Sequence, residues 1–124
     1  MDVSQEMLGD LMERCDRGCK EKVLPVRCEL PDLPLRSSSL DHVFMVNVLH
    51  EFEDRSLMVR EVFRVLKDGG RVTLVDFQKK STKRGPPLEI RIDEGDVPTI
   101  FNCMRLISRQ SFPSFYQFEF VKPL

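Results

Sequence analysis

The sequence lacks both a long apolar run and an excess of charge of one sign. None of its 124 residues belongs to a stretch near the ~20 consecutive apolar residues that a membrane-spanning helix needs. The formal net charge is −1, so no overall field attracts nucleic acid or anionic lipid. The first residues, Met1–Glu6, have neither the basic nor the apolar region of a secretory signal. We therefore expect a cytoplasmic protein without membrane or nucleic-acid partners.

Cysteine is scarce, and its spacing argues against a metal site. Cys15 and Cys19 are four residues apart at the end of one predicted helix, and Cys28 and Cys103 form no second close pair. Most zinc knuckles instead combine two C-x-x-C pairs on tight turns. We expect reduced thiols and no metal. If Cys15 and Cys19 did bind a soft metal, they would need further ligands from outside their helix.

The remaining composition is that of an ordinary globular protein. Apolar residues make up 41% of the chain and charged residues 31%. A chain of this length can bury one core. No internal repeat or low-complexity segment is visible. We therefore expect residues 1–124 to form a single domain.

The most informative segment runs from Leu40 to Phe77. It opens with the apolar run His42–Val46, which is too continuous for a strand with one wet face and predicts a strand covered on both faces. Asp54 can cap the helix that follows, and Gly69–Gly70 is predicted to end it. A second apolar run, Val72–Phe77, comes next. A strand, a helix and a strand joined by short loops predict a right-handed parallel unit.

Weaker patterns flank this unit. A helix is predicted from Ser4 to Arg17, and a strand from Lys22 to Glu29 in which Pro25 must lie at an edge or at the start. The basic stretch 78–87 is interpreted as a solvated loop, because no aromatic residues are interleaved to stack on bases.

The last quarter of the chain predicts one short helix and two strands. Asp96 followed by Val97-Pro98 is typical of a helix start. The segments Leu106–Phe112 and Phe115–Val121 are predicted to be strands separated by Pro113-Ser114, as expected for an antiparallel pair. In the second, Phe118 and Phe120 share one face, and the other face holds Gln117, Glu119 and Val121.

Four motifs occur in order along the first 77 residues. They are DVSQEML at 2–8, CELPDLP at 28–34, LDHVFMVNVLHEF at 40–52 and EVFRVLKDGGRVTLVDF at 61–77. Together they resemble class I S-adenosylmethionine-dependent methyltransferases, in which they lie at the second strand, the third strand, the fourth strand and the fifth strand with its preceding helix. The resemblance implies an α/β, Rossmann-like fold with a mostly parallel sheet, an antiparallel C-terminal strand pair and strand order 3-2-1-4-5-7-6.

The resemblance also implies a first strand and a glycine-rich cofactor turn before Asp2. The six glycines of the chain nowhere form G-x-G, so no other segment supplies such a turn. We therefore expect a truncated form of the fold that binds S-adenosylmethionine weakly or not at all. Without its neighbours the fourth strand would have an open edge. The third strand could close that edge, or a second copy or a separate chain could complete the sheet, and we expect a homodimer or such a chain as partner.

The resemblance implies that six positions contact S-adenosylmethionine. Four of them also have a structural alternative that stays open. Asp2 could be an N-terminal residue without a defined role, Met7 a core residue, Glu29 a solvated strand end and Asn47 a turn residue. The implied contacts are Asp2 for the ribose hydroxyls, Met7 for the adenosine, Glu29 and Leu30 for the adenine, and Asn47 and Val48 at the end of the fourth strand, where Asn47 contacts the methionine portion.

His50 and Glu51 are the acid–base candidates on the expected acceptor side. Methyl transfer from a sulfonium mainly needs alignment, and a base is needed only when the acceptor must lose a proton. His50 is therefore a catalytic candidate, with a structural role in its turn as the alternative. The resemblance implies methyl transfer to an acceptor that the sequence does not identify. The alternative, given the absent glycine turn, is a non-catalytic relative that acts as a dimerisation or protein-interaction module.

Overall fold

The computed structural model describes residues 1, 4–15 and 22–124. These residues divide into two units, Met1–Pro34 and Leu35–Leu124, and each unit is described by itself.

The first unit contains the helix α1, which runs from Gln5 to Arg14. The hydroxyl of Ser4 accepts a hydrogen bond from the N–H of Met7 at 3.2 Å, so the predicted N-cap is confirmed. The helix ends at Arg14, with Cys15 as its C-cap, and therefore stops short of the predicted end at Arg17.

The strand predicted from Lys22 to Glu29 is not formed. Within this segment only Arg27 makes a single β-bridge. Pro25 offers a physical reason, because a proline has no N–H to donate to a neighbouring strand and interrupts a ladder at its centre.

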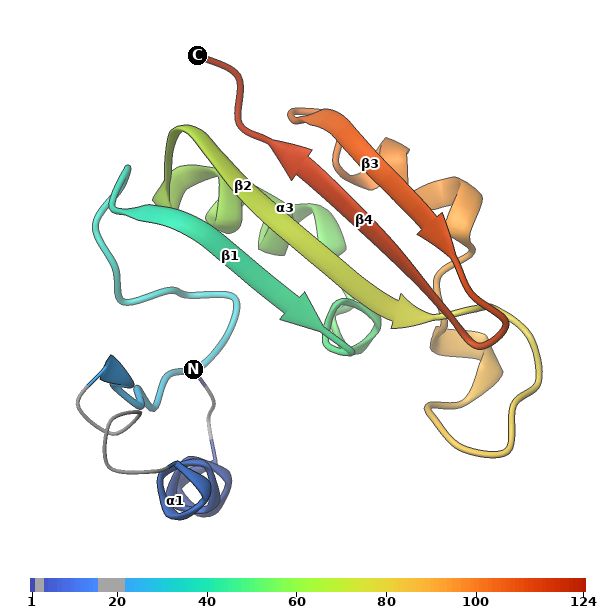
Figure 1. Cartoon of the computed structure of the whole chain (residues 1–124), viewed down its shortest axis with the longest axis horizontal. Helices are drawn as coiled ribbons and strands as arrows, with labels where there is room; N and C mark the ends of the chain where they lie inside the picture. Colours follow the sequence, from blue (N-terminus) through green and yellow to red (C-terminus); the bar gives the residue numbers. More distant parts are fainter. Residues whose placement is uncertain (2–3, 16–21) are drawn as a thin grey trace. The chain divides into compact units, whose positions relative to one another are not determined.

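The second unit is built on a four-stranded mixed sheet in the order β1-β2-β4-β3 (Figure 1). β1 and β2 are parallel, whereas β4 is antiparallel to both β2 and β3. The α/β fold, the order of these strands and the antiparallel C-terminal pair are confirmed. The described sheet is mixed and not mostly parallel as expected, since one of its three pairings is parallel. The strands are β1 (Leu40–Val46), β2 (Leu66–Phe77), β3 (Arg105–Ser111) and β4 (Phe115–Val121).

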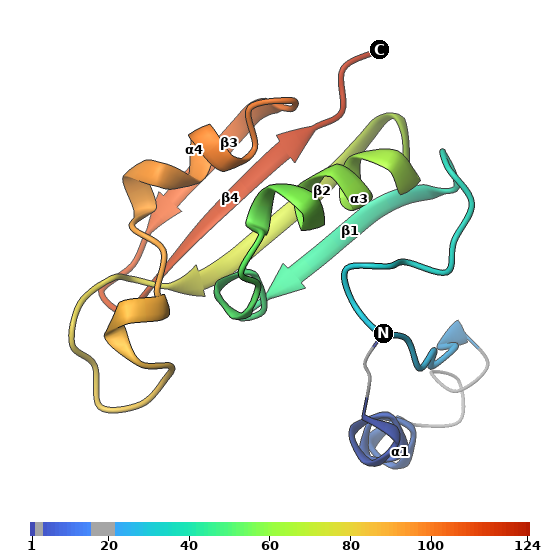
Figure 2. The same ribbon diagram turned by 180° about the vertical axis from the view of Figure 1, so that it is seen from behind.

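Two helices cover one face of this sheet. α3 (Arg55–Val65) and α4 (Val97–Ile100) both lie in front of the strands when the molecule is seen from behind (Figure 2). Asp54 caps α3 as predicted, since its carboxylate accepts a hydrogen bond from the N–H of Leu57 at 3.0 Å. Three short 3-10 turns complete the unit: η1 (Leu49–Glu51), η2 (Leu88–Ile90) and η3 (Glu94–Asp96).

The connection between α3 and β2 differs from the prediction. α3 ends at Val65 and β2 begins at Leu66, so Gly69–Gly70 lie within β2 and do not end the helix. They fall between the ladder residues Leu66 and Arg71, where the register with β1 shifts. Gly69 has a φ of +78°, and a Cβ on Gly70 would lie 2.8 Å from a backbone oxygen. The two glycines therefore form a bulge that other residues would strain.

The core lies between the sheet and its two helices. Alternate residues of β2 and β4 point into it, as the period of two in a strand requires. The rings of Phe101 and Phe120 stack with centroids 4.5 Å apart, so α4 and β4 share an aromatic contact. The largest fully buried side chains are Tyr116, Phe101, Phe118 and Phe120.

β1 is buried on one face only, contrary to the prediction. Met45 is 3% exposed, whereas Phe44 is 67% exposed and Val46 is 53% exposed. The reason is that α3 and α4 lie on the same side of the sheet (Figure 2). His42 also lies on the open face of β1, where its ring stacks on the ring of Phe44 with centroids 4.2 Å apart.

The predictions for the C-terminal part hold with one difference. The stretch 78–87 is a loop without helix or strand, and β3 and β4 lie within one residue of their predicted bounds. Asp96 occupies the N-cap position of α4, but it accepts no capping hydrogen bond from the described residues. Asp93 instead accepts one from the N–H of Gly95 at 2.9 Å and caps η3.

A buried lysine satisfies the end of α3. The Nζ of Lys122 donates hydrogen bonds to the carbonyl oxygens of Phe63 at 2.9 Å and Leu66 at 2.8 Å, and it lies 4.4 Å from the centre of the Phe63 ring. The last carbonyls of a helix lack partners within the helix and carry partial negative charge. Lys122 therefore joins the end of β4 to the start of β2.

We expect the substitution Lys122→Met to lower the free energy of unfolding by about 2 kcal/mol, because two carbonyls lose a charged donor while the apolar stem is kept. The matched control is Lys67→Met, which removes only an exposed ion pair with Asp41 and should cost less than about 0.5 kcal/mol. Urea unfolding of the three proteins measures both values. Equal losses in the two variants would contradict the role given to Lys122.

Candidate functional site

The carboxyl ends of β1 and β2 lie at the same edge of the sheet, because the two strands are parallel (Figure 1). In open α/β sheets, ligands bind at this edge. The chain leaves β1 at Asn47 and forms η1, while β2 reaches the same edge with Asp76 and Phe77. Polar side chains from both strand ends therefore meet here.

Asn47 is held in an unusual backbone conformation. Its φ is +56°, in the left-handed region that asparagine tolerates better than most residues, and its N–H donates to the carbonyl oxygen of Val75 at 2.8 Å. Its side-chain Oδ1 is buried and has no hydrogen-bond partner among the described residues. An unpaired buried acceptor costs about 1–3 kcal/mol. The carboxamide is thus placed where a donor from a ligand would be favourable.

His50 and Asp76 form a buried pair. The Nδ1 of His50 lies 2.7 Å from the Oδ1 of Asp76, and the two residues are 6% and 1% exposed. The N–H of Phe77 donates to the same oxygen at 2.8 Å. A carboxylate at Nδ1 favours the tautomer with its proton there, which leaves Nε2 of the neutral ring as an acceptor. No hydrogen bond to Nε2 is formed within residues 4–15 or 22–124, so the lone pair of that atom is open to a donor from a ligand.

Arg55 binds the turn that carries His50. Its Nη2 donates to the carbonyl oxygen of Ile90 at 2.7 Å and approaches that of His50 at 3.5 Å. Buried polar atoms are rarely left without partners in proteins. In the part of the chain that the structure describes, the buried side-chain atoms without a hydrogen-bond partner are Asn47 Oδ1, Arg55 Nε and Asp76 Oδ2. All three belong to this edge of the sheet, which is what a ligand site built from these strand ends requires.

Tyr116 closes the buried side of the site. Its hydroxyl donates to the carbonyl oxygen of Ile92 at 2.9 Å. Burial raises the pKa of Tyr116 well above its ordinary value, the negative charge of Asp76 raises it further, and Arg55 opposes the shift. The folded state therefore keeps its phenol proton after the unfolded state has lost it, so this contribution to stability declines as the pH rises past about 10.

The residues of the first unit that are expected to contact the cofactor differ in their exposure and local structure. Asp2 lies outside the described residues. Met7 lies on α1 and is 58% exposed, so within this structure it does not serve as a core residue. Glu29 is exposed at a turn that it shares with Leu30, and the N–H of Asp32 donates to its carbonyl oxygen at 3.1 Å.

The contacts expected in the second unit gather at the carboxyl edge. Asn47 and Val48 follow β1 directly, and His50 comes one turn later. The structure pairs His50 with Asp76 and leaves Glu51 exposed, so the acid next to His50 in sequence is not its partner in space. The sequence analysis missed Asp76. A carboxylate at a core-facing position of an apolar strand is the signal that could have revealed it, because burying a charge is costly without a partner.

Comparison with known proteins assigns this architecture to a family. Residues 1–74 match a family model described as a methyltransferase domain, which is more than half of the chain. The chain belongs to the class I S-adenosylmethionine-dependent methyltransferases. The family resemblance found in the sequence is therefore confirmed.

One similar protein is the ubiquinone/menaquinone biosynthesis C-methyltransferase UbiE of Cellvibrio japonicus. This methyltransferase-family chain is 32% identical to it over 79 residues, which cover 63% of the chain and 32% of that enzyme. The chain spans about a third of the length of the curated relatives that it matches.

Solved structures share the fold. A SAM-dependent methyltransferase from Aquifex aeolicus superimposes with a TM-score of 0.85 at 22% identity, over 97% of this chain and 65% of that one. A complex between the Trm112 methyltransferase activator of Haloferax volcanii and a methyltransferase superimposes with a TM-score of 0.78 at 15% identity, over 98% and 70%. At these identities the likeness shows the fold.

No group of three or more metal-binding side chains is found in residues 1, 4–15 and 22–124. None of the helices built from those residues has the length and apolar character to cross a bilayer.

The substitution Asp76→Asn should lower the pKa of Tyr116, because the carboxylate charge that opposes phenolate formation is removed. Tyr116 is the one tyrosine of the chain, so the absorbance change of phenolate formation during alkaline titration reports it alone. Asp68→Asn, a change of the same kind at an exposed position, is the control and should leave the titration unchanged. Coincident titration curves for Asp76→Asn and the wild type would show that the two groups do not interact.

Proposed function

We propose that this protein binds S-adenosylmethionine at the carboxyl edge of its sheet and transfers the methyl group to a further molecule. Membership of the methyltransferase family supports the activity, and the observation that carries its location is the buried Oδ1 of Asn47 without a donor.

The residues at this edge fit the cofactor's chemistry. A carboxamide oxygen accepts hydrogen bonds, and the amino-acid portion of S-adenosylmethionine carries an ammonium group that donates them. Asn47 would hold that portion, with Val48 beside it. For the adenosine we propose the residues named by the family resemblance: Asp2, Met7, Glu29 and Leu30.

The His50–Asp76 pair provides the acid–base chemistry. When bound, S-adenosylmethionine supplies a methyl group on a positively charged sulfur, and the carbon–sulfur bond breaks with its electron pair left on sulfur. His50 takes the proton of an acceptor that must lose one, at Nε2. Asp76 holds the ring in orientation through Nδ1 and stabilises the imidazolium that results, since the two atoms are 2.7 Å apart.

Asn47→Ala tests the location of the cofactor. Calorimetric titration with S-adenosylhomocysteine should show a dissociation constant roughly tenfold higher than that of the wild type, because one hydrogen bond is worth about 1 kcal/mol or more when a charged donor is involved. Asn102→Ala, at an exposed asparagine, is the control and should bind as the wild type does. Unchanged binding by the Asn47 variant would contradict the proposed position. The dissociation constant of the wild type also tests the expectation from the sequence that this chain binds the cofactor weakly or not at all.

A second candidate function, an interaction module, is favoured by the open face of β1. Phe44 and Val46 are both more than half exposed, and β1 is an outer strand of the described sheet. Burying such a surface gains about 25 cal/mol for each Å² removed from water, before the cost of association. We propose that a second copy of the chain, or a chain that supplies further strands, covers this face together with the free edge of β1.

Phe44→Glu tests the dimer. Sedimentation at micromolar concentration should show a dimer for the wild type and a monomer for this variant, because a carboxylate would be buried in the interface. Phe112→Glu alters an aromatic residue of similar exposure on the β3–β4 hairpin and should remain dimeric. A monomeric wild type would exclude the homodimer and leave the separate chain as the proposed partner.

We further propose that residues 1–124 act as one domain in the cytoplasm. The family match over residues 1–74 runs through the division between Pro34 and Leu35, which supports a single domain. Cys28 and Cys103 are free thiols, the usual state of cysteine in a reducing compartment.

A further inference from the structure

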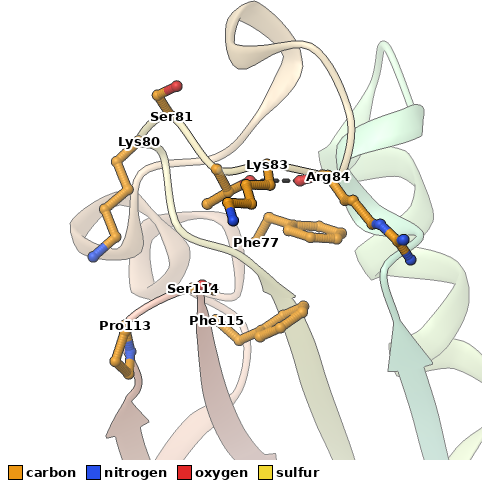
Figure 3. A pocket seen from close by; sticks show the side chains of 9 residues that line it. Phe77, Lys80, Ser81, Lys83, Arg84, Pro113, Ser114 and Phe115 are labelled. Atoms are coloured by element: carbon orange, nitrogen blue, oxygen red, sulfur yellow. Dashed lines mark hydrogen bonds between the residues drawn. The ribbon is translucent and has the colours of Figure 1, made fainter.

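An open cavity of 640 Å³ lies between the loop 78–87 and the hairpin that joins β3 to β4 (Figure 3). Phe77 and Phe115 line it at the strand ends, and residues 80–84 line it from the loop. Its volume falls in the range of about 300–1,000 Å³ that is usual for small-molecule sites. The cavity is thus large enough for an organic ligand.

A buried arginine holds the loop wall of this cavity in place. Arg91 is 5% exposed, and its guanidinium carbon lies 5.2 Å from the centre of the Phe77 ring. The planar guanidinium offers five donors in a fixed arrangement, so it can fix several carbonyls at once. It donates to the carbonyl oxygens of Gln78, Lys80, Arg84 and Pro86.

The second wall is tied to the first. The side chain of Gln78 donates to the carbonyl oxygens of Phe112 at 3.3 Å and Phe115 at 3.2 Å, which binds the hairpin to the start of the loop. Gly85 has a φ of +115°, and a Cβ there would lie 2.8 Å from the Phe77 ring, so only glycine lets the loop approach so closely. Both walls are therefore preorganised, which reduces the cost of ordering a site when a ligand binds.

The loop carries four positive charges and no acidic residue of its own. These are Lys79, Lys80, Lys83 and Arg84, and residues 78–88 contain no Asp or Glu. None of the four forms an ion pair within the described part of the chain. Figure 3 shows the Lys80 and Lys83 side chains extending toward the hairpin. Like charges held close together repel, and an anion between them would relieve that repulsion.

An aromatic pair accompanies these charges. The rings of Phe77 and Phe115 have centroids 4.7 Å apart and are tilted by 39°. Phe77 also connects this aromatic pair to the proposed site, because its ring packs against the ring of His50 with centroids 6.4 Å apart. The sequence interpretation of a purely solvated loop rested on the lack of interleaved aromatic residues, and the fold brings two of them from β2 and β4.

We propose that this cavity binds a small aromatic carboxylate, with its ring against Phe77 and Phe115 and its charge at the ammonium groups of Lys80 and Lys83. A cavity bounded by two tied walls favours a small molecule over a polymer. The inference rests on the proposed function in one respect, since it identifies this anion as the class of methyl acceptor. A hydroxyl on its ring would lose its proton to Nε2 of His50 while its oxygen bonds to the methyl carbon, whose bond to sulfur breaks with the electron pair left on sulfur. Phe77 supports that role, because it lines the cavity and its ring also contacts the ring of His50.

The charge is tested with 2-naphthoate as the probe, titrated into the intact chain and followed by calorimetry. The double variant Lys80→Gln, Lys83→Gln should bind roughly tenfold more weakly than the wild type, and added salt should weaken wild-type binding. Lys79→Gln removes one positive charge from the same loop at a position that does not line the cavity, so binding should change less than about twofold. Equal losses in the two proteins would overturn the proposal.

The ring and the position are tested in parallel. The neutral analogue 2-naphthylmethanol should bind roughly tenfold more weakly than 2-naphthoate if the carboxylate is recognised. Phe115→Leu should weaken binding, whereas Phe112→Leu, at an exposed neighbour outside the cavity, should not. Chemical-shift changes on titration should centre on Phe77 and Phe115. No binding up to millimolar probe, or changes centred on Phe44, would overturn the assignment.

Titration of the same samples with S-adenosylhomocysteine separates this inference from the proposed function. Binding of 2-naphthoate without binding of S-adenosylhomocysteine would support the cavity and overturn its role as an acceptor site. Binding of S-adenosylhomocysteine without 2-naphthoate would overturn the cavity assignment and leave the proposed function standing.

Discussion

The parallel pairing of β1 with β2 is the constraint from which the rest of the second unit follows. Parallel neighbours need a crossover, and α3 makes it, covering the face into which Met45 and Leu74 point. The same pairing brings both carboxyl ends to one edge. Asn47 and His50 from one strand end thereby meet Asp76 from the other. Had the two strands been antiparallel, these side chains would lie at opposite edges and no site could form.

The carboxyl edge is also where the described structure departs from complete internal hydrogen bonding. The core elsewhere is apolar or well paired, as Lys122 and Tyr116 illustrate by donating to backbone carbonyls. At the edge, Asn47 and Asp76 keep buried oxygens without donors. Such atoms lower stability, and proteins commonly retain them where a ligand supplies the partner. Family membership indicates the kind of activity, and this local deficit is the separate observation on which its proposed location rests.

Much of the fold could be predicted from local patterns. The caps Ser4 and Asp54 and the β3–β4 hairpin depend on interactions between residues close in sequence, and they form as expected. The strand at 72–77 is marked by its continuous apolar run, although its ladder partners are distant. Predictions failed where a distant element decides the outcome. The run His42–Val46 is apolar enough for two covered faces, but the helices of its unit lie on one side. Gly69–Gly70 could have ended a helix, yet the register between β1 and β2 places them in a bulge.

By itself, the sequence determined the strand–helix–strand unit, the family and the carboxyl-edge position of Asn47 and His50, because apolar periodicity and short motifs record local geometry. Only the tertiary structure decided the partners of these residues. Asp76 lies 26 residues from His50, and the adjacent acid Glu51 points elsewhere. The basic loop gained its aromatic neighbours in the same way, since Phe115 reaches Phe77 only through the pairing of β4 with β2. Contacts of this kind arise from strand register and helix placement, which no single stretch of the chain encodes.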